Sequence, residues 1–491
     1  MHRPTMSERI RALLTARNPW WRDHRARPPG LQPYKRKALP ALVRRVLSPD
    51  PAGGRALLLT GLRRVGKTEL ARQVVDRALR GGRFRPTDVA FIQADDARVE
   101  GALSLARVLE AWEPHRDLER MGLLVVDEIQ RLSDPESPGG AAWAGQLQGV
   151  VDDPTLRLQV LATGSAALRL RDGGGAGAGR WDRQILEPLS FREFRELRHL
   201  KRSGEEVPSR EHRFEDLQCY LALGGFPEFS GEQSPRRAYE RIRGYADAVL
   251  RTDVGEVRSP LRVVQLLAIL LDESGGELNV REVSRELGAN RESIDRWLRD
   301  FEDAYLVQVV RRLDTRELRE LRGNPRVYGT DPGLVAAFST NPAPLSDGLV
   351  RGSLAEAAVL RHLREVATRA HGRITCAPRR TTKGKGGGID FVLHAPNDVF
   401  FIEVTAGTRR LTEKARYVRE VMDHAAGPMR LSPTVRDREL HGMVVHGGAV
   451  DEPRHVACVS LATFLERVLD STSTTAEEAL APLRAMARGN P

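Results

Sequence analysis

The chain has 491 residues, which is too long for one compact core, so we expect three or four domains. A composition of 41% hydrophobic and 29% charged residues is typical of a soluble globular protein and excludes a largely disordered chain. No apolar run approaches the ~20 residues of a membrane span, and the basic N-terminus lacks the apolar core of a secretory signal. We therefore expect no membrane partner. The three cysteines, Cys219, Cys376 and Cys458, have no metal-ligand spacing, so we expect free thiols and a cytoplasmic location.

The formal net charge is +11, and most of the excess lies near the N-terminus. Residues 1–55 contain 13 Lys or Arg but only 3 Asp or Glu. A basic segment of this kind favours an anionic partner, most often nucleic acid. We therefore predict a basic N-terminal arm over residues 1–50 that contacts nucleic acid. The alternative is a solvated arm, because arginine is common along the whole chain.

A phosphate-binding pattern follows an apolar strand predicted over residues 56–59. The segment GLRRVGKT matches G-x-x-x-x-G-K-[ST], and an amphipathic helix comes after it, as the pattern requires. Backbone N–H groups and the helix N-terminus would hold phosphates, Lys67 would reach the β- and γ-phosphates, and Thr68 would bind Mg²⁺. The pattern predicts ATP and Mg as cofactors. The expected nucleotide contacts are Gly61, Arg63, Arg64, Val65, Gly66, Lys67, Thr68 and Glu69.

A second buried strand, over residues 123–126, ends in two acids. In a P-loop ATPase the acid at this strand end holds Mg²⁺. The next acid can act as the general base that activates the attacking water. We assign Asp127 to magnesium and Glu128 to the water.

A third strand, in LRLQVLATGS, leads to Thr163 and Ser165, polar residues that could sense the γ-phosphate. A glycine-rich stretch follows, and Arg180 stands just beyond it. We consider Arg180 a candidate trans-acting finger or sensor, and the alternative is a surface arginine. A trans-acting finger would require a homo-oligomer or a domain motion.

The middle of the chain predicts three further parts. Residues 196–260 have helical spacing and predict a helical lid, interrupted by the turn in LGGFPEF. Residues 261–320 predict a winged helix, with a turn GAN and a second helix capped by Asn290. This module could contact DNA or serve as interdomain packing, because Glu292 and Asp295 on the second helix would repel phosphate. Residues 321–345, with the turn DPG, predict a linker.

Six segments occur in the order found in one prokaryotic AAA-type ATPase family: NPWW, GLRRVGKT, LLVVDEIQ, LATGSAALRL, ILEPLSFREF and YLALGGFPEF. The chain resembles this family, which is similar to the archaeal ATPases and the STAND signalling ATPases, over nearly its whole length. The resemblance implies an α/β protein with a doubly wound P-loop ATPase core over residues 51–195, then the helical lid and the winged helix. It also implies a PD-(D/E)XK nuclease-like α/β domain over residues 346–470 and a helical tail over residues 471–491.

The resemblance further implies a second metal site in the nuclease-like domain. A predicted helix bears Glu356, and two apolar strands carry Asp390 and Glu403, which fill the three acid positions for one or two Mg²⁺ ions. The position of the motif lysine holds Thr405, which brings no charge. Lys383 or Lys385, in the preceding glycine-rich loop, could replace that lysine. We expect an inactive nucleic-acid-binding or structural module, and the alternative is an active nuclease.

Together these patterns predict a cytoplasmic, Mg-dependent ATPase that acts as a switch or remodeler with nucleic acid. ATP is expected to bind between the core and the lid. The family resemblance suggests a role in mobile-element or phage defence. Two alternatives remain: an ATP-gated signalling scaffold that binds partner proteins, and a DNA nuclease licensed by ATP.

Overall fold

The computed structural model describes residues 5–47, 56–99, 101–133, 143–164, 180–204, 211–252, 260–314, 319–320, 324–377, 388–408, 410–431, 438–448, 452–453, 456–469 and 475–489. The chain divides into two compact units, Met1–Leu186 and Glu187–Pro491. Within the described residues, every helix is too short or too polar to cross a membrane.

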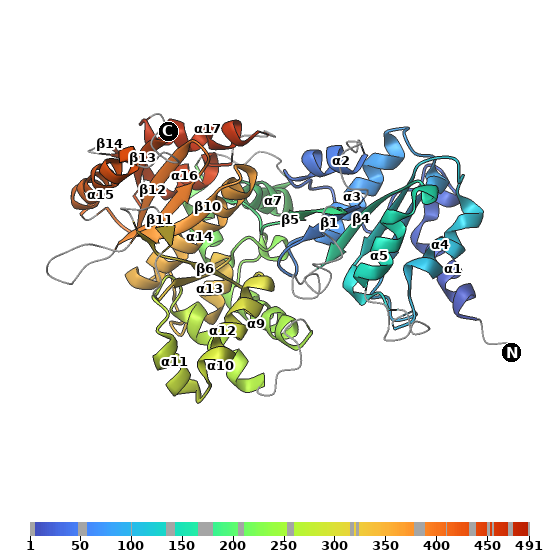
Figure 1. Cartoon of the computed structure of the whole chain (residues 1–491), viewed down its shortest axis with the longest axis horizontal. Helices are drawn as coiled ribbons and strands as arrows, with labels where there is room; N and C mark the ends of the chain where they lie inside the picture. Colours follow the sequence, from blue (N-terminus) through green and yellow to red (C-terminus); the bar gives the residue numbers. More distant parts are fainter. Residues whose placement is uncertain are drawn as a thin grey trace. The chain divides into compact units, whose positions relative to one another are not determined.

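The N-terminal unit is built on a five-stranded sheet in the order β2-β3-β4-β1-β5, with every pair parallel (Figure 1). Its strands β1, β3 and β4 are buried along their whole length, as parallel strands covered on both faces are. The strands are β1 (Ala56–Thr60), β2 (Val89–Gln93), β3 (Gly122–Asp127), β4 (Leu158–Gly164) and β5 (Trp181–Ile185). This sheet confirms the predicted α/β class and is consistent with a P-loop ATPase core.

Helix α3, which follows the phosphate-binding loop, packs against β2, β3 and β4, and α1 packs against α4 and β2. The helices of this unit are α1 (Met6–Arg17), α2 (Leu39–Leu47), α3 (Lys67–Arg80), α4 (Leu105–Trp112) and α5 (Trp143–Asp152). Its 3-10 turns are η1 (Pro19–Trp21), η2 (Pro86–Asp88), η3 (Glu113–His115), η4 (Ile129–Arg131) and η5 (Pro154–Leu156).

The segment predicted as a basic arm is instead folded onto the edge of the sheet. Asn18 is fully buried; its amide donates to the Phe91 carbonyl (3.0 Å) and accepts from the Phe91 N–H (2.6 Å). The indole N–H groups of Trp20 and Trp21 both donate to the Val89 carbonyl, at 2.9 and 2.8 Å. These contacts occupy backbone groups of β2, which is an edge strand of the sheet. The NPWW segment therefore seals an edge of the core.

Basic residues of the same segment are paired with acids of the N-terminal unit. Arg17 lies 3.0 Å from Asp96, and Arg27 lies 3.0 Å from Asp76. Arg45 pairs with Asp182 of β5 at 2.6 Å. Each solvent-exposed pair contributes little stability, but together they offset part of the positive charge that suggested a free nucleic-acid-binding arm.

The C-terminal unit is built on a six-stranded mixed sheet in the order β10-β11-β12-β13-β15-β14. The pairs β12–β13 and β13–β15 are parallel, and the other three are antiparallel. The strands are β10 (Arg373–Ala377), β11 (Ile389–His394), β12 (Asp398–Thr405), β13 (Glu439–His446), β14 (Glu452–Pro453) and β15 (Ala457–Ser460).

Two long helices cover this sheet, and three shorter ones complete its surroundings. Helix α14 packs against β10, β11 and β12, whereas α15 packs on β13 through a buried cluster that includes Val392, Phe401 and Val418. The helices are α13 (Pro332–Phe338), α14 (Gly348–Arg369), α15 (Leu411–Leu431), α16 (Leu461–Arg467) and α17 (Ala476–Ala487).

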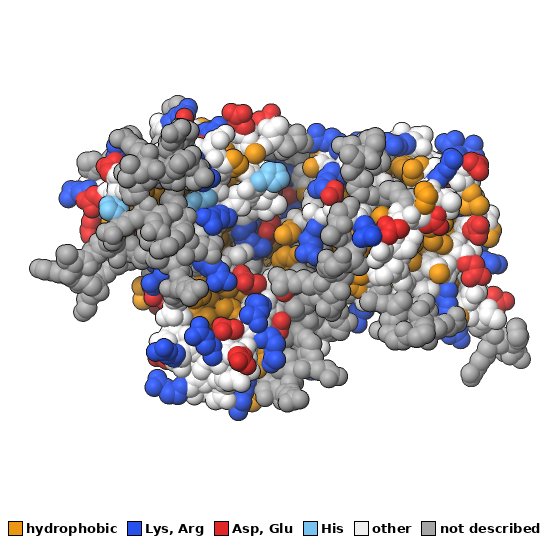
Figure 2. Space-filling model, in the orientation of Figure 1, with side chains coloured by type: hydrophobic (Ala, Val, Ile, Leu, Met, Phe, Trp, Pro, Cys, Tyr) orange, Lys and Arg blue, Asp and Glu red, His pale blue; other side chains and the backbone are white. Residues whose placement is uncertain are grey.

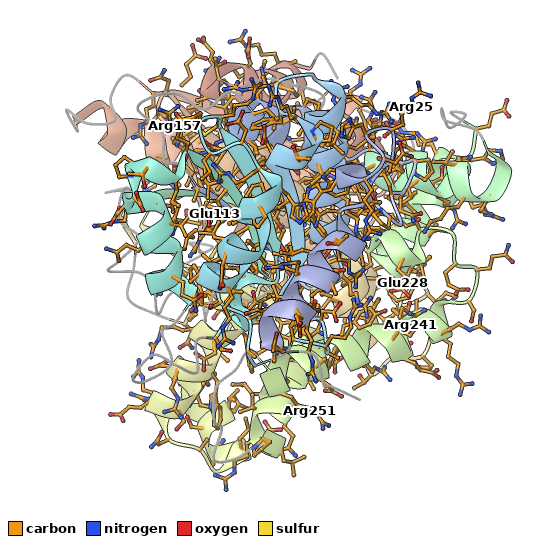
Figure 3. All side chains as sticks on the ribbon, turned by 90° about the vertical axis from the view of Figure 1, so that its right-hand side faces the viewer. Arg25, Glu113, Arg157, Glu228, Arg241 and Arg251 are labelled. Carbon is orange, nitrogen blue, oxygen red and sulfur yellow. The ribbon has the colours of Figure 1, made fainter. Side chains whose placement is uncertain are left out.

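The predicted lid is helical, as expected, but its helices pack within the C-terminal unit. These are α7 (Phe191–Ser203), α8 (Arg213–Leu223), η6 (Pro227–Phe229) and α9 (Pro235–Thr252). Helices α8 and α9 contact α13, and α7 contacts α16. Glu228 of η6 forms an ion pair with Arg241 of α9, and both residues are labelled in Figure 3. The predicted linker is not a linker either, because residues 332–337 of α13 are all buried.

Three helices and a two-stranded antiparallel sheet stand between the lid and α13. They are α10 (Pro260–Asp272), α11 (Val280–Leu287), α12 (Arg291–Asp303), β6 (Val307–Val310) and β9 (Arg326–Gly329), with a further short pair, β7 (Leu313–Asp314) and β8 (Arg319–Glu320). Asn290 caps α12 by accepting the Ser293 N–H at 2.8 Å, as the sequence predicts. Basic and acidic side chains are interspersed over the lobe of α10–α12 (Figure 2).

Candidate nucleotide site and acidic centre

The carboxyl edge of the N-terminal sheet brings together three polar residues that the sequence singled out. Asp127, at the end of β3, is buried. Its Oδ1 accepts hydrogen bonds from the hydroxyls of Thr68 (3.0 Å) and Thr163 (2.5 Å). Because the carboxyl ends of parallel strands meet at one edge, residues 36 to 59 positions away in the chain converge on one carboxylate.

The electrostatics of this carboxylate suit a cation. Burial raises the pKa of Asp127 and the nearby charge of Glu128 adds to the rise, while the two hydroxyl hydrogen bonds oppose it. A buried acid beside a second acid is stabilised by a positive charge. Carboxylate and hydroxyl oxygens are ligands that Mg²⁺ prefers, so Thr68 and Asp127 fit the magnesium that accompanies a nucleotide.

The phosphate-binding loop has the backbone that its glycines permit. Gly61 has a φ of +146°, and a Cβ there would lie 2.3 Å from the Leu186 carbonyl oxygen. Lys67 is buried, and its Nζ donates to the carbonyls of Gly61 (3.0 Å) and Leu62 (2.9 Å). The ammonium is thus held within the loop, where phosphate oxygens could replace these carbonyls as its partners.

Glu128 occupies a backbone conformation that is uncommon for a residue with a side chain. Its φ of 56° and ψ of 50° lie in the left-handed region. Its N–H donates to the Thr163 hydroxyl (3.1 Å), and its carboxylate accepts from Gln130 (2.5 Å). Such strain concentrates at functional sites. Here it orients the acid immediately after Asp127.

The sequence analysis missed three residues around this edge. Gln93 ends β2 opposite Asp127, and its amide lies 3.4 Å from Asp127 Oδ2. Burial, and then the charge of Glu128, raise the pKa of Asp95, which makes it a third acid at the strand ends. Arg36, from the N-terminal segment, is buried and donates to the Val65 carbonyl at 2.8 Å. The signal for Asp95 was present, because FIQADD places acids directly after a strand.

The other predicted nucleotide contacts have mixed positions. Arg63 is half-buried, Arg64 is exposed and Val65 is buried. Glu69 accepts the Gln32 N–H at 2.7 Å, so its carboxylate holds the N-terminal segment, and burial raises its pKa. A nucleotide contact by Glu69 is therefore not supported by this geometry.

The two remaining residues of the predicted site are Arg180 and Ser165. The Arg180 guanidinium pairs with Asp152 at 3.0 Å, within the same unit, and its role as a finger or sensor stays a prediction. Ser165 lies outside the described residues, so its predicted role in sensing the γ-phosphate stays a prediction.

In the C-terminal unit, the three predicted acids converge. We call Glu356, Asp390 and Glu403 the acidic centre. The antiparallel pairing of Phe391 with Ile402 brings Asp390 of β11 beside Glu403 of β12. The charges of both residues act on Glu356 of α14. Three segments of the chain thus supply one carboxylate each to a common place.

These carboxyls carry more negative charge than their surroundings favour. Burial raises the pKa of Glu403 to about 8, and the charge of Asp390 contributes to the rise. Burial and the charge of Asp390 also raise the pKa of Glu356 well above its usual value. The Glu403 Oε2 atom is buried and has no hydrogen-bond partner among the described residues. Such a centre favours positive charge, and its carboxylate oxygens are the ligand type for Mg²⁺.

A lysine reaches the acidic centre from a different element than the sequence motif predicts. Lys414 of α15 donates from Nζ to Glu403 Oε1 (2.6 Å) and to the Val404 carbonyl (3.1 Å). Burial lowers the pKa of Lys414, but attraction to Glu403 outweighs it, and the net shift is upward. Thr405 therefore does not leave the site without an ammonium group. Lys383 and Lys385, the predicted substitutes, lie outside the described residues.

An arginine and a tyrosine of β9 also contact the acidic centre. Arg326 Nη1 donates to Asp390 Oδ1 at 2.9 Å, and the Val404 N–H donates to Asp390 Oδ2 at 2.8 Å. Tyr328 is buried, lies 3.4 Å from Arg326 Nη1, and forms a hydrogen bond with Glu356. In this structure, basic side chains and hydrogen-bond donors of the protein therefore contact the carboxyl groups of the acidic centre.

A groove of about 740 Å³ opens beside the acidic centre. Glu356 and Lys414 form part of its wall, and Arg351 stands five residues before Glu356 on α14. Five glycines also line it: Gly275, Gly276, Gly348, Gly352 and Gly407. Without side chains at those positions, a ligand backbone could approach the acids closely.

A second group of metal-ligating side chains lies elsewhere on the same sheet. Among the described residues, Asp398, Glu439 and His441 form the one group of three whose ligand atoms all lie within 4.8 Å of one another. Arg484 binds both oxygens of Asp398, at 2.9 and 2.7 Å. We interpret this cluster as an ion-pair network that fixes α17 to the sheet, because a guanidinium already satisfies its buried acid.

Comparison with known proteins matches two stretches of the chain. A family model described as an AAA domain matches residues 53–195, and a model described as a domain of unknown function (DUF8612) matches residues 214–344. Residues 53–195 thus form an AAA-type, P-loop ATPase domain. The second match covers the helices before the mixed sheet, not the region of residues 346–470 that the resemblance assigns to a nuclease-like domain. No curated protein matches the chain.

The chain is also similar in fold to solved ATPases. The Walker-type ATPase PABY2304 of Pyrococcus abyssi is 16% identical, with 62% of this chain and 95% of that chain covered and a TM-score of 0.40. AMPPCP-bound DnaA from Aquifex aeolicus is 16% identical, with 54% and 86% covered and a TM-score of 0.26. Likenesses this distant carry no inference about residues, ligands or partners.

Proposed function

We propose that the chain is a Mg-dependent ATP-hydrolysing switch in which Thr68 and Asp127 hold the magnesium and Glu128 orients the attacking water. The observation that carries this is the pairing of Asp127 with Thr68 and Thr163 at the carboxyl edge of the AAA sheet. Lys67 would neutralise charge on the β- and γ-phosphates, and Thr163 would relay the state of the γ-phosphate through its bonds to Asp127 and Glu128.

Two variants separate binding from hydrolysis. Lys67→Ala should lose ATP binding and turnover together, because the loop ammonium contacts phosphate in every state. Glu128→Gln should bind ATP in Mg²⁺ but turn it over at least about 100-fold more slowly, because the general base is absent. Equal turnover in Glu128→Gln and the wild type would remove Glu128 from the mechanism. Ser133→Ala, placed beyond η4, serves as a control variant on the same stretch.

We further propose that this switch acts with nucleic acid through the C-terminal unit. The order of α10, α11, α12 and the β6–β9 pair supports a winged-helix module, which is a common nucleic-acid-binding fold. The mixed charge on α11 and α12 favours backbone contact or packing over base-specific recognition. A role in mobile-element or phage defence stays a prediction from the family resemblance.

The acidic centre supports a second candidate function, a metal-dependent phosphodiesterase. The specific observation is Lys414, whose ammonium contacts Glu403 and could take the part of the missing motif lysine. Glu356, Asp390 and Glu403 would hold the divalent cation, which would supply an activated water, while Lys414 would stabilise charge on the phosphate. The helix–strands–helix–strand order from α14 to β13 supports a PD-(D/E)XK-like fold. Lys414 therefore supports nuclease activity although Thr405 replaces the motif lysine.

A plasmid and oligonucleotide cleavage assay tests the second candidate. In Mg²⁺ or Mn²⁺ with ATP, cleavage is expected in the wild type and should be lost in Asp390→Ala and Lys414→Ala. Arg416→Ala, an exposed residue on the same helix, should leave cleavage unchanged. Cleavage that persists in Asp390→Ala would assign it to a contaminant or another site.

A further inference from the structure

We propose that Arg326 is a built-in counter-ion of the acidic centre, and that a divalent cation must displace its guanidinium to bind there. The inference rests on the second candidate function, in which the acidic centre is a cation site. It concerns a residue outside the predicted motif. Arg326 comes from β9, in the segment between the α10–α12 helices and α13, and not from the mixed sheet.

The guanidinium takes a ligand atom that a metal would need. Arg326 Nη1 lies 2.9 Å from Asp390 Oδ1, and the other oxygen of Asp390 accepts the Val404 N–H at 2.8 Å. Both oxygens of this carboxylate are therefore occupied by donors. Consistent with this, the three acids do not form a group whose ligand atoms all lie within 4.8 Å of one another. The cluster is held open by an arginine.

The backbone around Arg326 is attached to the wall of the acidic centre. Gly275 N–H donates to the Val327 carbonyl (2.8 Å), and Val327 N–H donates to the Gly276 carbonyl (3.2 Å). A Cβ on Gly275 would lie 2.9 Å from Glu356 Oε2, so this turn lies directly against the third acid. Two backbone hydrogen bonds thus tie the strand of Arg326 and Tyr328 to the turn after α10, so a motion of the α10–α12 module would be expected to shift the guanidinium.

A counter-ion that can be displaced makes metal affinity a competition. The apparent affinity is the intrinsic affinity multiplied by the fraction of molecules in which Arg326 has left Asp390. Removing the guanidinium removes that competition and frees Asp390 Oδ1, while Glu403 Oε2 has no hydrogen-bond partner among the described residues. Metal binding favours the arrangement in which Arg326 has left Asp390. A shift of the α10–α12 module that withdraws Arg326 favours the same arrangement, so the two events would be linked.

Mn²⁺ binding without nucleotide, followed by electron paramagnetic resonance, tests the proposal directly. Arg326→Gln should bind Mn²⁺ at least about tenfold more tightly than the wild type, and adding Glu403→Gln should abolish this gain. The control is Arg312→Gln, because Arg312 pairs with Glu277 in the same turn but does not contact the three acids. Arg326→Lys keeps the charge and the fold but makes a weaker contact, so it should show an intermediate affinity.

The outcomes are distinguishable. Equal Mn²⁺ affinity in the wild type, Arg326→Lys and Arg326→Gln, with binding lost in Glu403→Gln, would overturn the counter-ion role but leave the cation site standing. No Mn²⁺ binding at the acidic centre in any variant would overturn the cation site and the counter-ion proposal together. Neither result bears on ATP hydrolysis, which the Lys67 and Glu128 variants test separately.

Discussion

At the scale of single residues, Lys414 changes the interpretation of the acidic centre most. A pattern of closely spaced residues on one strand could not reveal it, because Lys414 lies nine positions after Thr405 and reaches Glu403 only when α15 folds back on β12. The acids were predictable, since carboxylates in dense apolar strands are costly unless they serve a site. The lysine was not, since an exposed helical lysine is ordinary.

The Lys414–Glu403 pair gives a prediction about stability. At pH 9, above the pKa of Glu403, Lys414→Met should lower the free energy of unfolding by about 3 kcal/mol, because the carboxylate is then buried without its cation or must take up a proton. Adding Glu403→Gln should recover most of that loss, since the ionisable carboxyl is then gone. Denaturant unfolding of the two single variants and the double variant measures the coupling. Additive effects of the two substitutions would show that the ion pair has no energetic role.

Asp331 gives a prediction about pH. Burial raises the pKa of Asp331 to about 6, although the N–H groups of Gly225 and Gly333 oppose the rise. The folded state therefore favours the neutral carboxyl, so its contribution is complete below the unfolded pKa near 4 and is lost as pH rises through about 6. The loss amounts to about 3 kcal/mol. Thermal unfolding from pH 4 to 7 should show the wild type losing stability relative to Asp331→Asn. A constant difference across this range would contradict the shifted pKa.

At the scale of elements, two turns far apart in the sequence form one joint. Gly225 N–H donates to Asp331 Oδ2 at 2.7 Å, so the GGFPE turn and the DPG turn meet at the start of α13. The sequence predicted both turns from their glycines and prolines. It could not predict that they touch, and it therefore assigned α13 to a linker although the helix is buried.

Gly224 is a position in this joint where a side chain would not fit. Its φ is +70°, and a Cβ there would lie 1.8 Å from Asp331 Oδ1. Gly224→Ala should therefore lower the unfolding free energy by about 2–4 kcal/mol. Gly244→Ala is the matched control, because a Cβ on Gly244 in α9 meets nothing within 4 Å, and alanine should be neutral or stabilising by up to about 1 kcal/mol. Equal stabilities of the two variants in urea unfolding would mean that the close approach at Gly224 is not rigid.

The N-terminal segment shows what composition cannot predict. Its positive net charge follows from the sequence, but its contacts do not: Asn18 bonds both backbone groups of Phe91, and Arg36 supports the phosphate-binding loop. The ATPase core, in contrast, was predictable from short segments. Its strands are continuous apolar runs, and the residues expected to bind phosphate lie next to one another in the chain.

At the scale of the whole molecule, helix α14 connects several functional features. Arg361 and His362 hold the Pro188 carbonyl and the Phe191 N–H, in the last residues of the stretch that matches the AAA domain. Glu356, five residues before Arg361 on the same helix, belongs to the acidic centre. Helix α14 thus links this stretch to the acidic centre within the C-terminal unit.

The central claim, an ATP-hydrolysing switch that acts with nucleic acid, is tested most directly by steady-state ATP turnover. Turnover in Mg²⁺ should be measured alone and with single-stranded DNA, duplex DNA or RNA, with Lys67→Ala as the background control. We predict that at least one nucleic acid changes turnover severalfold, that added salt weakens the effect, and that Lys67→Ala shows no turnover at all. Turnover that is the same with and without every nucleic acid, or that survives in Lys67→Ala, would contradict the account.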